Sequence, residues 1–308
     1  MDDILIKILG AIATVILAFM VGMTYGGLSR KVIARIQNRI GPPWYQNFID
    51  NFKLLFKVSN INHGFMQHVA PLWMIGMSIT TVLFIPVLIP GGDAWYNSWF
   101  PNLNFHGDLI FLLYMMVIGS LGMALGAGQT GNPNSAIGVS RGLTQMVGFE
   151  VPWVMALVAL MIQYKTTSIT GLMAAAEQQG TWLAFSSPFA TLAALLAMPG
   201  MFRYSPFDIV GAPAELASGP ISEFGGKYLS TMMTSGSIFA FVKLTLYVDI
   251  FFGGAHNLVE LVLKTFILYM FPVLWGAVSP RFRTEQAVRF FWGWPVLFGI
   301  IALIQASL

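Results

Sequence analysis

The chain has 308 residues, of which 56% are hydrophobic and only 9% are charged, whereas soluble globular domains carry about 25% charged residues. This composition excludes an ordinary soluble domain. The net charge of +3 comes from too few charges to form the dense basic surface of a nucleic-acid-binding protein, so we expect no nucleic-acid partner. The absence of cysteine excludes thiolate catalysis and cysteine-held iron–sulfur clusters on this chain.

Long apolar runs predict an all-α integral membrane protein. A helix that crosses the hydrocarbon core of a bilayer needs about 20 mainly apolar residues, and runs of this kind are separated by polar or Pro/Gly-rich breaks. We expect a single transmembrane domain over residues 1–308 with about eight spans. The spans are predicted at 4–28, 70–90, 108–128, 147–163, 185–202, 231–252, 259–278 and 288–306.

The basic residues gather on one side of the predicted spans. Lys and Arg resist translocation, so the loops that are rich in them face the cytoplasm. Twelve of the 16 Lys and Arg lie in the loops of one side, whereas Lys7 and Lys165 lie on the other and Lys243 and Lys264 lie inside spans. We therefore expect a multi-pass protein of the cell membrane, in contact with the lipid bilayer, with both termini outside the cytoplasm.

The first cytoplasmic loop, predicted at 29–69, contains a stretch with helical apolar spacing. Phe48, Ile49, Phe52, Leu55 and Phe56 recur on one face. This pattern predicts an amphipathic helix that lies in the plane of the membrane interface. An ordinary surface helix that rests on protein is the alternative, and the two interpretations are not exclusive.

A second unusual cytoplasmic loop spans residues 203–230. It is rich in Pro and Gly, yet it carries Asp208, Glu215 and Glu223 together with several large apolar residues. A solvated linker would not be so apolar. We expect a folded segment that lines a cavity or docks another protein.

Several ionisable residues fall inside or beside the predicted spans. They are Glu150, at the predicted start of the fourth span, Lys243 and Asp249 in the sixth, and Glu260 and Lys264 in the seventh. Such residues are costly in a membrane and usually face a partner or a polar route. Glu260 and Lys264 are four residues apart and are expected to pair, with a purely structural pair as the alternative. Asp249 lies close to an interface, where simple solvation is the alternative.

Carboxylates and lysines that exchange protons through water are the groups that a proton or sodium route requires. We hypothesise that Glu150, Asp208, Glu215 and Glu223 form a polar path from the cytoplasmic face. Lys243 and Lys264 would carry this path sideways toward a neighbouring membrane subunit, with Asp249 and Glu260 as further members.

Several segments together resemble one family over nearly the whole chain. The segments are RIQNRIGPP at 35–43, NFKLLFK at 51–57, SRGLTQMVGFEVPW at 140–153, SPFDIVGAPAELASGPISEFGG at 205–226, LKTFILYM around Lys264 and PRFRTEQ at 280–286. In this order they resemble the complex I subunit-1 family, also called the NuoH family. The resemblance implies the membrane subunit beneath a cytoplasmic redox arm, with the 29–69 and 203–230 loops docking that arm.

The resemblance also implies a set of partners and residue roles. The partners are antiporter-like membrane subunits, a ferredoxin-like Fe–S subunit, and large and small subunits of the [NiFe]-hydrogenase type. Fe–S clusters and a Ni–Fe centre would lie on these partners, with no cofactor and no catalytic residue on this chain. Candidate redox-arm contacts are the basic residues Arg35, Arg39, Arg141, Arg203, Arg281 and Arg283.

The chain departs from the quinone-reducing members of the family. Where those members usually carry further glutamates, this chain has Gly211, Pro213 and Ser235. It is therefore more similar to the corresponding subunit of membrane-bound energy-converting [NiFe] hydrogenases and of membrane-bound sulfane sulfur reductases. We favour the hydrogenase, with the sulfur reductase and a quinone-reducing NADH dehydrogenase-like complex as alternatives. A stand-alone secondary transporter is a remote alternative, because no repeated halves are found.

Overall fold

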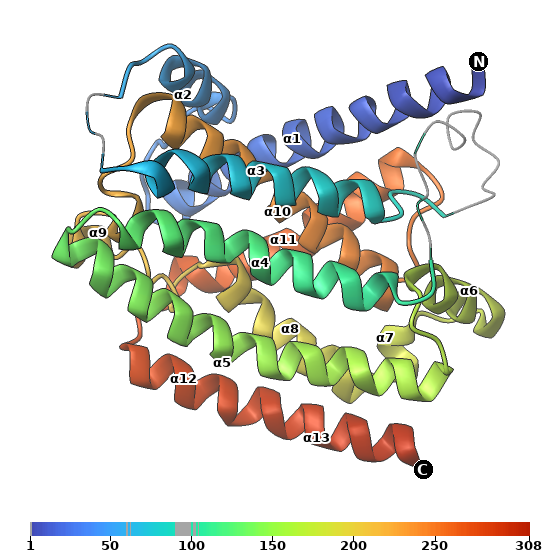
Figure 1. Ribbon diagram of the computed structural model, residues 1–308. Helices are drawn as coiled ribbons and strands as arrows, with labels where there is room; N and C mark the ends of the chain where they lie inside the picture. Colours follow the sequence, from blue (N-terminus) through green and yellow to red (C-terminus); the bar gives the residue numbers. More distant parts are fainter. Residues whose placement is uncertain (1, 60, 62, 90–99, 101–102, 104) are drawn as a thin grey trace.

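The computed structural model describes residues 2–59, 61, 63–89, 100, 103 and 105–308. Every regular element in these ranges is a helix, and the long helices run side by side in one bundle (Figure 1). The helices are α1 (Asp2–Ile36), α2 (Gln46–Leu55), α3 (Phe65–Phe84), α4 (Asp108–Gly128), α5 (Pro133–Tyr164), α6 (Ile169–Gln179), α7 (Leu183–Ser186), α8 (Pro188–Phe202), α9 (Pro213–Leu216), the 3-10 helix Gly219–Ile221, α10 (Gly226–Phe251), α11 (Leu258–Val278), α12 (Thr284–Trp292) and α13 (Trp294–Ser307).

The expected all-α membrane protein is confirmed. Within the described residues, seven helical segments are long and apolar enough to cross a membrane, with α12 and α13 counted as one segment. The predicted fifth span is the exception, because α8 has only 15 residues and reaches roughly 22 Å at 1.5 Å per residue. Its alanines are fully buried, so this face of α8 packs among other helices.

The bundle has two ends. The α2 end carries α2, α9 and the start of α12, whereas the α6 end carries α6 and α7 (Figure 1). Helix α1 begins and α13 ends at the α6 end. Both ends of the described chain therefore lie on the same side, and the assignment of that side to the extracytoplasmic face stays a prediction.

Helix α10 is the central helix of the bundle. It buries 72% of its most apolar window, against 28–44% for the other spanning segments, and it packs on α1, α2, α3 and α11. The contact with α1 is so close that a Cβ atom on Gly22 would lie 2.1 Å from the backbone oxygen of Ser237. Glycine at this position lets the two backbones approach each other.

Two helices are longer than the sequence predicts. Helix α1 continues to Ile36, into the predicted loop, and α5 begins at Pro133 and not near residue 147. Proline suits the first turn of a helix, and the side chain of the preceding Asn132 caps α5 by accepting a hydrogen bond from Asn134 N at 2.9 Å. The polar residues that interrupt the apolar run, Arg141 among them, lie on this helix. They do not form a loop.

The two predicted loops are folded. The amphipathic helix of the first loop is present as α2, whose Asn51 is buried against α10 and bonds to Ser230 Oγ at 2.6 Å through its side-chain oxygen. Phe52 of α2 and Phe56, the residue that follows the helix, stay exposed. The segment from 203 to 225 forms α9 and a 3-10 helix and buries Phe207, so it is not a solvated linker.

Candidate functional site

An arginine–carboxylate cluster lies at the α2 end and consists of Arg141, Asp208, Glu215 and Arg281. Arg141 Nη1 lies 2.7 Å from Glu215 Oε2, and Arg281 Nη2 lies 3.0 Å from Asp208 Oδ2. Arg281 Nη1 is also 3.7 Å from Glu215 Oε1. The cluster joins α5, the 203–225 segment and the α11–α12 connection. Because it contains two arginines and two carboxylates, its charges neutralise one another within the chain.

The two carboxyl groups of this cluster differ in their electrostatics. The hydrogen bond from Arg141, with the charges of Arg141 and Arg281, holds the pKa of Glu215 below its usual value. Burial raises the pKa of Asp208, against the opposing hydrogen bond and charge of Arg281 and the charge of Arg203. The pKa values of these two carboxyl groups are therefore shifted in opposite directions.

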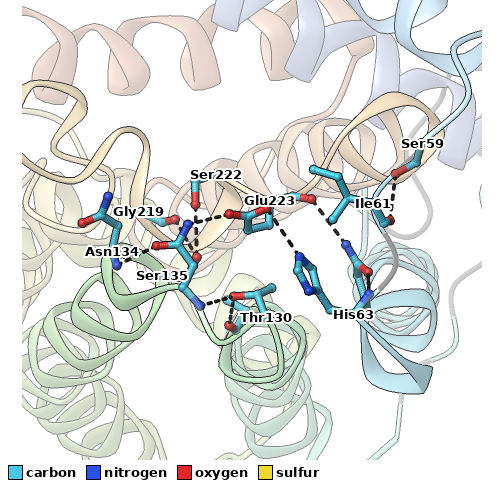
Figure 2. A network of polar contacts seen from close by, with 12 residues as sticks. Ser59, Ile61, His63, Thr130, Asn134, Ser135, Gly219, Ser222 and Glu223 are labelled. Atoms are coloured by element: carbon cyan, nitrogen blue, oxygen red, sulfur yellow. Dashed lines mark hydrogen bonds and ion pairs between the residues drawn. The ribbon is translucent and has the colours of Figure 1, made fainter.

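Glu223 belongs to a separate polar network (Figure 2). Its Oε1 accepts a hydrogen bond from Asn132 Nδ2 at 2.5 Å, and its Oε2 lies 3.5 Å from His63 Nε2. Gln67 Nε2 donates to the Glu223 backbone oxygen at 3.3 Å. The bond from Asn132 and the contact with His63 lower the pKa of Glu223. The network fastens the segment before α10 to the ends of α3, α4 and α5.

Glu150, Lys243 and Arg203 face one another inside the bundle. A cavity of about 50 Å³ is lined by all three together with Gln145. Lys243 Nζ donates to Met201 O at 3.0 Å and lies 5.7 Å from the centre of the Phe202 ring. No hydrogen bond to the Glu150 carboxylate is present among the described residues.

Two larger cavities extend from this centre. One, of about 360 Å³, is lined by Lys243, Arg203 and Tyr204 and reaches α1 and α2. The other, of about 460 Å³, lies between α4 and α5 and is almost wholly apolar, with Glu150 at one side. Arg203, whose surface is accessible, borders three cavities. Glu150 therefore lies between an internal polar space and an apolar one.

The four carboxylates that the sequence places in one path occupy three different surroundings. Asp208 and Glu215 share the arginine–carboxylate cluster, Glu223 lies in the network of Figure 2, and Glu150 lies in the interior. The expected position of Glu150 at the start of a span is wrong, because the helix begins 17 residues earlier at Pro133. The charge of Arg203 interacts both with Asp208 and with Lys243 of the interior, so Arg203 links the two sites electrostatically.

The predicted pair in α11 is present at the α6 end. Lys264 Nζ lies 2.7 Å from Glu260 Oε1. Asp249, in the last turn of α10, is fully buried, and neither of its carboxylate oxygens has a hydrogen-bond partner among the described residues. Simple solvation of Asp249 is therefore wrong.

The six candidate redox-arm arginines differ in their surroundings. Arg35, Arg39 and Arg283 are exposed, and Arg39 donates to Gln37 Oε1. Arg283 precedes α12, where its backbone N donates to Gln286 Oε1 at 2.9 Å. The other three, Arg141, Arg203 and Arg281, contact carboxylates or cavities of this chain. A contact between any of them and a partner stays a prediction.

Ser235, which stands where quinone-reducing members of the family usually carry a glutamate, makes a buried contact between two helices. Ser235 Oγ is buried and donates to Met74 O at 2.9 Å, which joins α10 to α3. A glutamate side chain at this position would enter a packed contact between two helices. At Gly211, in contrast, an added Cβ would meet only Asp208 Oδ1, at 3.8 Å.

Several residues of these sites are not distinguished by the sequence. Asn132, His63 and Gln145 carry no local pattern that separates them from other polar residues, and their partners are distant in the chain. Asn132 has one usable signal, because Asn directly before Pro is a common start of a helix. Within the described residues, no group of three or more His, Cys, Asp or Glu side chains is arranged to hold a metal ion.

The fold and the buried charges define a class: a multi-pass helical membrane subunit with folded polar segments at one end. Comparisons identify the family. A family model described as NADH dehydrogenase matches residues 6–307, and the chain therefore belongs to this family, which contains the NuoH-like membrane subunits of complex I-like assemblies.

Relatives agree over most of the chain. The chain is 30% identical to the H subunit of NADH-quinone oxidoreductase from Protochlamydia amoebophila (strain UWE25), over 90% of this chain and 88% of the relative. It is 27% identical to the same subunit of Bacillus thuringiensis (strain Al Hakam), over 90% and 86%. A chain in the solved structure of the membrane-bound sulfane sulfur reductase, an archaeal respiratory membrane complex, superimposes with a TM-score of 0.90 at 33% identity, over 98% of this chain and 99% of that chain.

Proposed function

We propose that this chain is the membrane-arm subunit that couples electron transfer in a cytoplasmic Fe–S-containing arm to the movement of Na⁺ or H⁺ through the membrane. The observation that carries the proposal is the interior group of Glu150, Lys243 and Arg203 around one cavity. Charged side chains at membrane depth are costly and are retained where they face a route or a partner. A passive anchor has no need of Glu150 and Lys243 within spanning helices.

The connection to the α2 end supports the same role. The charge of Asp208 acts on Arg203, and the charges of Arg203 and Glu150 act on Lys243. A change of charge or position in the 203–225 segment therefore alters the electrostatic environment of the interior group. We propose that this segment and the 29–69 loop contact the redox arm, so that turnover in the arm moves charges that the interior group senses.

Replacement of Glu150 by Gln in the intact complex tests the ion-coupling role. We expect the complex to assemble and to keep its electron transfer, while ion uptake into inverted membrane vesicles is lost. Glu177→Gln is the matched control, because Glu177 is an exposed glutamate of α6 and its replacement leaves uptake unchanged. Undiminished uptake in Glu150→Gln with normal turnover would overturn the proposal.

The kind of complex is a second question. Two candidates are the sulfane sulfur reductase and the [NiFe] hydrogenase, and the similarity at 33% identity over 98% of the chain favours the sulfur reductase. The packed contact of Ser235, in place of a glutamate of the quinone-reducing members, argues against a quinone reductase.

The nickel-to-iron ratio of the complex, purified through a tag on a cytoplasmic partner, separates these candidates. Abundant iron without nickel is expected for a sulfur-reducing arm. Stoichiometric nickel would assign the hydrogenase arm and overturn the preference for sulfur reduction.

A further inference from the structure

Asp249 is an unusual residue of the α6 end. Its side chain is fully buried in the last turn of α10, and both carboxylate oxygens lack a hydrogen-bond partner among the described residues. The hydroxyl of Thr245, one turn earlier on the same face, also lacks a partner there. Buried polar groups are almost always hydrogen-bonded, so two unpartnered groups on one helix face call for an explanation.

Asp108 shows how this protein treats a buried aspartate with a structural role. Asp108 is also fully buried, but its Oδ1 accepts a hydrogen bond from Ile169 N at 2.9 Å and its Oδ2 accepts one from Ser168 Oγ at 3.1 Å. These bonds hold the start of α6. In the part of the chain that the structure describes, Asp249 has no such donors, and an ionised carboxylate without donors is far costlier to bury than a neutral acid. Burial without donors therefore favours the neutral form of the Asp249 side chain.

Lys264 is the charged group that acts on Asp249. Its Nζ donates to Gly254 O at 2.7 Å and to Phe252 O at 3.1 Å, and it lies 2.7 Å from Glu260 Oε1. An ammonium group has three N–H donors, and these three contacts occupy them. Phe252 and Gly254 lie shortly after Asp249 in the chain, so the ammonium lies at the end of α10 that also carries the buried acid.

Glu260 is the outer partner of Lys264. Its second oxygen accepts a hydrogen bond from His256 N at 2.8 Å, and the side chains of Glu260 and Lys264 are 31% and 19% exposed. The group therefore runs from a buried acid, through a lysine, to a carboxylate that reaches the surface at the α6 end. His256 is the remaining titratable residue beside Glu260.

We propose that Asp249 holds an exchangeable proton and that the Lys264 ammonium changes partner between Glu260 and Asp249. In the first state the ammonium pairs with ionised Glu260 while Asp249 is protonated. In the second state the proton of Asp249 has passed to Glu260, and the ammonium pairs with ionised Asp249. Each state contains one ammonium, one carboxylate and one carboxylic acid, so the exchange moves one proton outward without changing the total charge of the group.

This exchange site deepens the proposed ion-coupling function, on which its purpose rests, by assigning a proton-releasing step to the end of the bundle opposite the arginine–carboxylate cluster. The flexible four-carbon stem of a lysine suits a change of partner. The existence of the proton on Asp249 can be tested without turnover. A failure of ion coupling in Glu150→Gln experiments and a failure of this inference are therefore distinguishable.

The test is infrared spectroscopy of the intact purified complex in H₂O and D₂O. Protonated carboxyl groups absorb apart from carboxylates, and the band shifts on exchange to deuterium. We expect Asp249→Asn to remove one exchangeable protonated-carboxyl band and Asp108→Asn, the matched buried aspartate, to leave that band in place. A spectrum of Asp249→Asn that keeps the full band would overturn the proposal.

A second variant guards against failure of Asp249→Asn to assemble. Glu260→Gln removes the outer carboxylate, which leaves the ammonium to pair with Asp249. We expect the same band to fall in Glu260→Gln, because Asp249 then ionises beside Lys264. An unchanged band in Glu260→Gln, with the complex assembled, contradicts the exchange of partners.

Discussion

Arg281 Nη2 lies 3.0 Å from Asp208 Oδ2, in an ion pair that joins segments 73 residues apart in the chain. The same guanidinium reaches Glu215, which is held more closely by Arg141 of α5. Three segments therefore meet in one cluster at the α2 end. Because Asp208 also acts on Arg203, a partner that displaced Arg281 would change the charge balance next to the interior cavity.

The stability that Glu215 contributes is expected to depend on pH. Its pKa is lowered in the folded protein, first by the hydrogen bond from Arg141. A carboxyl group with a depressed folded pKa contributes stability above its unfolded pKa, about 4.3 for Glu, and this stability is lost as the pH falls through the folded pKa. Glu215→Gln should therefore lower the thermal unfolding midpoint of the complex at neutral pH and have little effect in acid.

Asp208 has the opposite sign. Its pKa is raised, first by burial, so its contribution is present below the unfolded pKa, about 3.9 for Asp, and is lost as the pH rises through the raised folded pKa. Asp208→Asn is the matched control for Glu215→Gln. A double-mutant cycle with Arg281→Gln separates the lost bond to Arg281 from the effect of the raised pKa. With that bond accounted for, Asp208→Asn should raise the unfolding midpoint at neutral pH, whereas Glu215→Gln lowers it. Equal pH profiles for the two variants would contradict these pKa directions.

Asn132 is expected to stabilise the network around Glu223 in two ways. Its side-chain oxygen caps α5, and its amide donates to Glu223 Oε1. Asn132→Ala loses both and should destabilise the protein by about 1 kcal/mol for the cap alone. Asn132→Asp keeps a capping oxygen but sets a second carboxylate against Glu223, so it tests the donor separately in thermal unfolding.

A second substitution tests whether Asn132→Asp destabilises the protein through Glu223 or through a general disturbance of the fold. Glu223→Gln supplies a donor to the new carboxylate and removes the repulsion. The double variant should therefore be more stable than Asn132→Asp alone. If it is not, the bond between these two side chains contributes nothing to stability.

Local patterns allow part of the fold to be predicted. Glu260 and Lys264 are four residues apart, which places them on one helix face wherever the helix lies, and their contact at 2.7 Å confirms the pair. The apolar spacing of α2 is likewise a property of ten adjacent residues. Both predictions succeed because they need no knowledge of distant segments.

Distant contacts decide the predictions that fail. The start of α5 is not evident from the sequence because Arg141 is polar, and its polarity is balanced by Glu215, 74 residues away. Solvation of Asp249 is a reasonable alternative for a residue near the end of its span, yet neighbouring helices, including α6 and α11, cover that end. Burial of a helix end depends on the elements that pack over it, which the sequence of that helix does not contain.

The close approach of α1 to α10 is expected to be intolerant of a methyl group. A Cβ at residue 22 would lie 2.1 Å from the oxygen of Ser237, a backbone atom that cannot rotate away. Overpacking of this kind costs about 1–3 kcal/mol, so Gly22→Ala should lower the thermal unfolding midpoint. Gly76→Ala is the matched control, since nothing lies within 4 Å of its Cβ and alanine favours a helix by up to about 1 kcal/mol.

The exposed apolar face of α2 is expected to lie in the membrane interface. Phe52 and Phe56 are 52% and 87% exposed, whereas Asn51 on the opposite side is buried against α10. Apolar side chains of a surface helix at the edge of a membrane bundle gain stability by entering the boundary between headgroups and acyl chains. The natural absence of cysteine allows single-cysteine variants to carry a spin label without further changes.

Spin labels at Phe52→Cys and Phe56→Cys in vesicles should collide more often with oxygen, which concentrates in lipid, than with a water-soluble nickel chelate. Asp50→Cys is the matched position, because Asp50 is a charged residue of the same helix that pairs with Arg30 at 3.4 Å. Its label should show the reverse preference. If all three labels preferred the chelate, the apolar face of α2 would lie in water and not in the membrane interface.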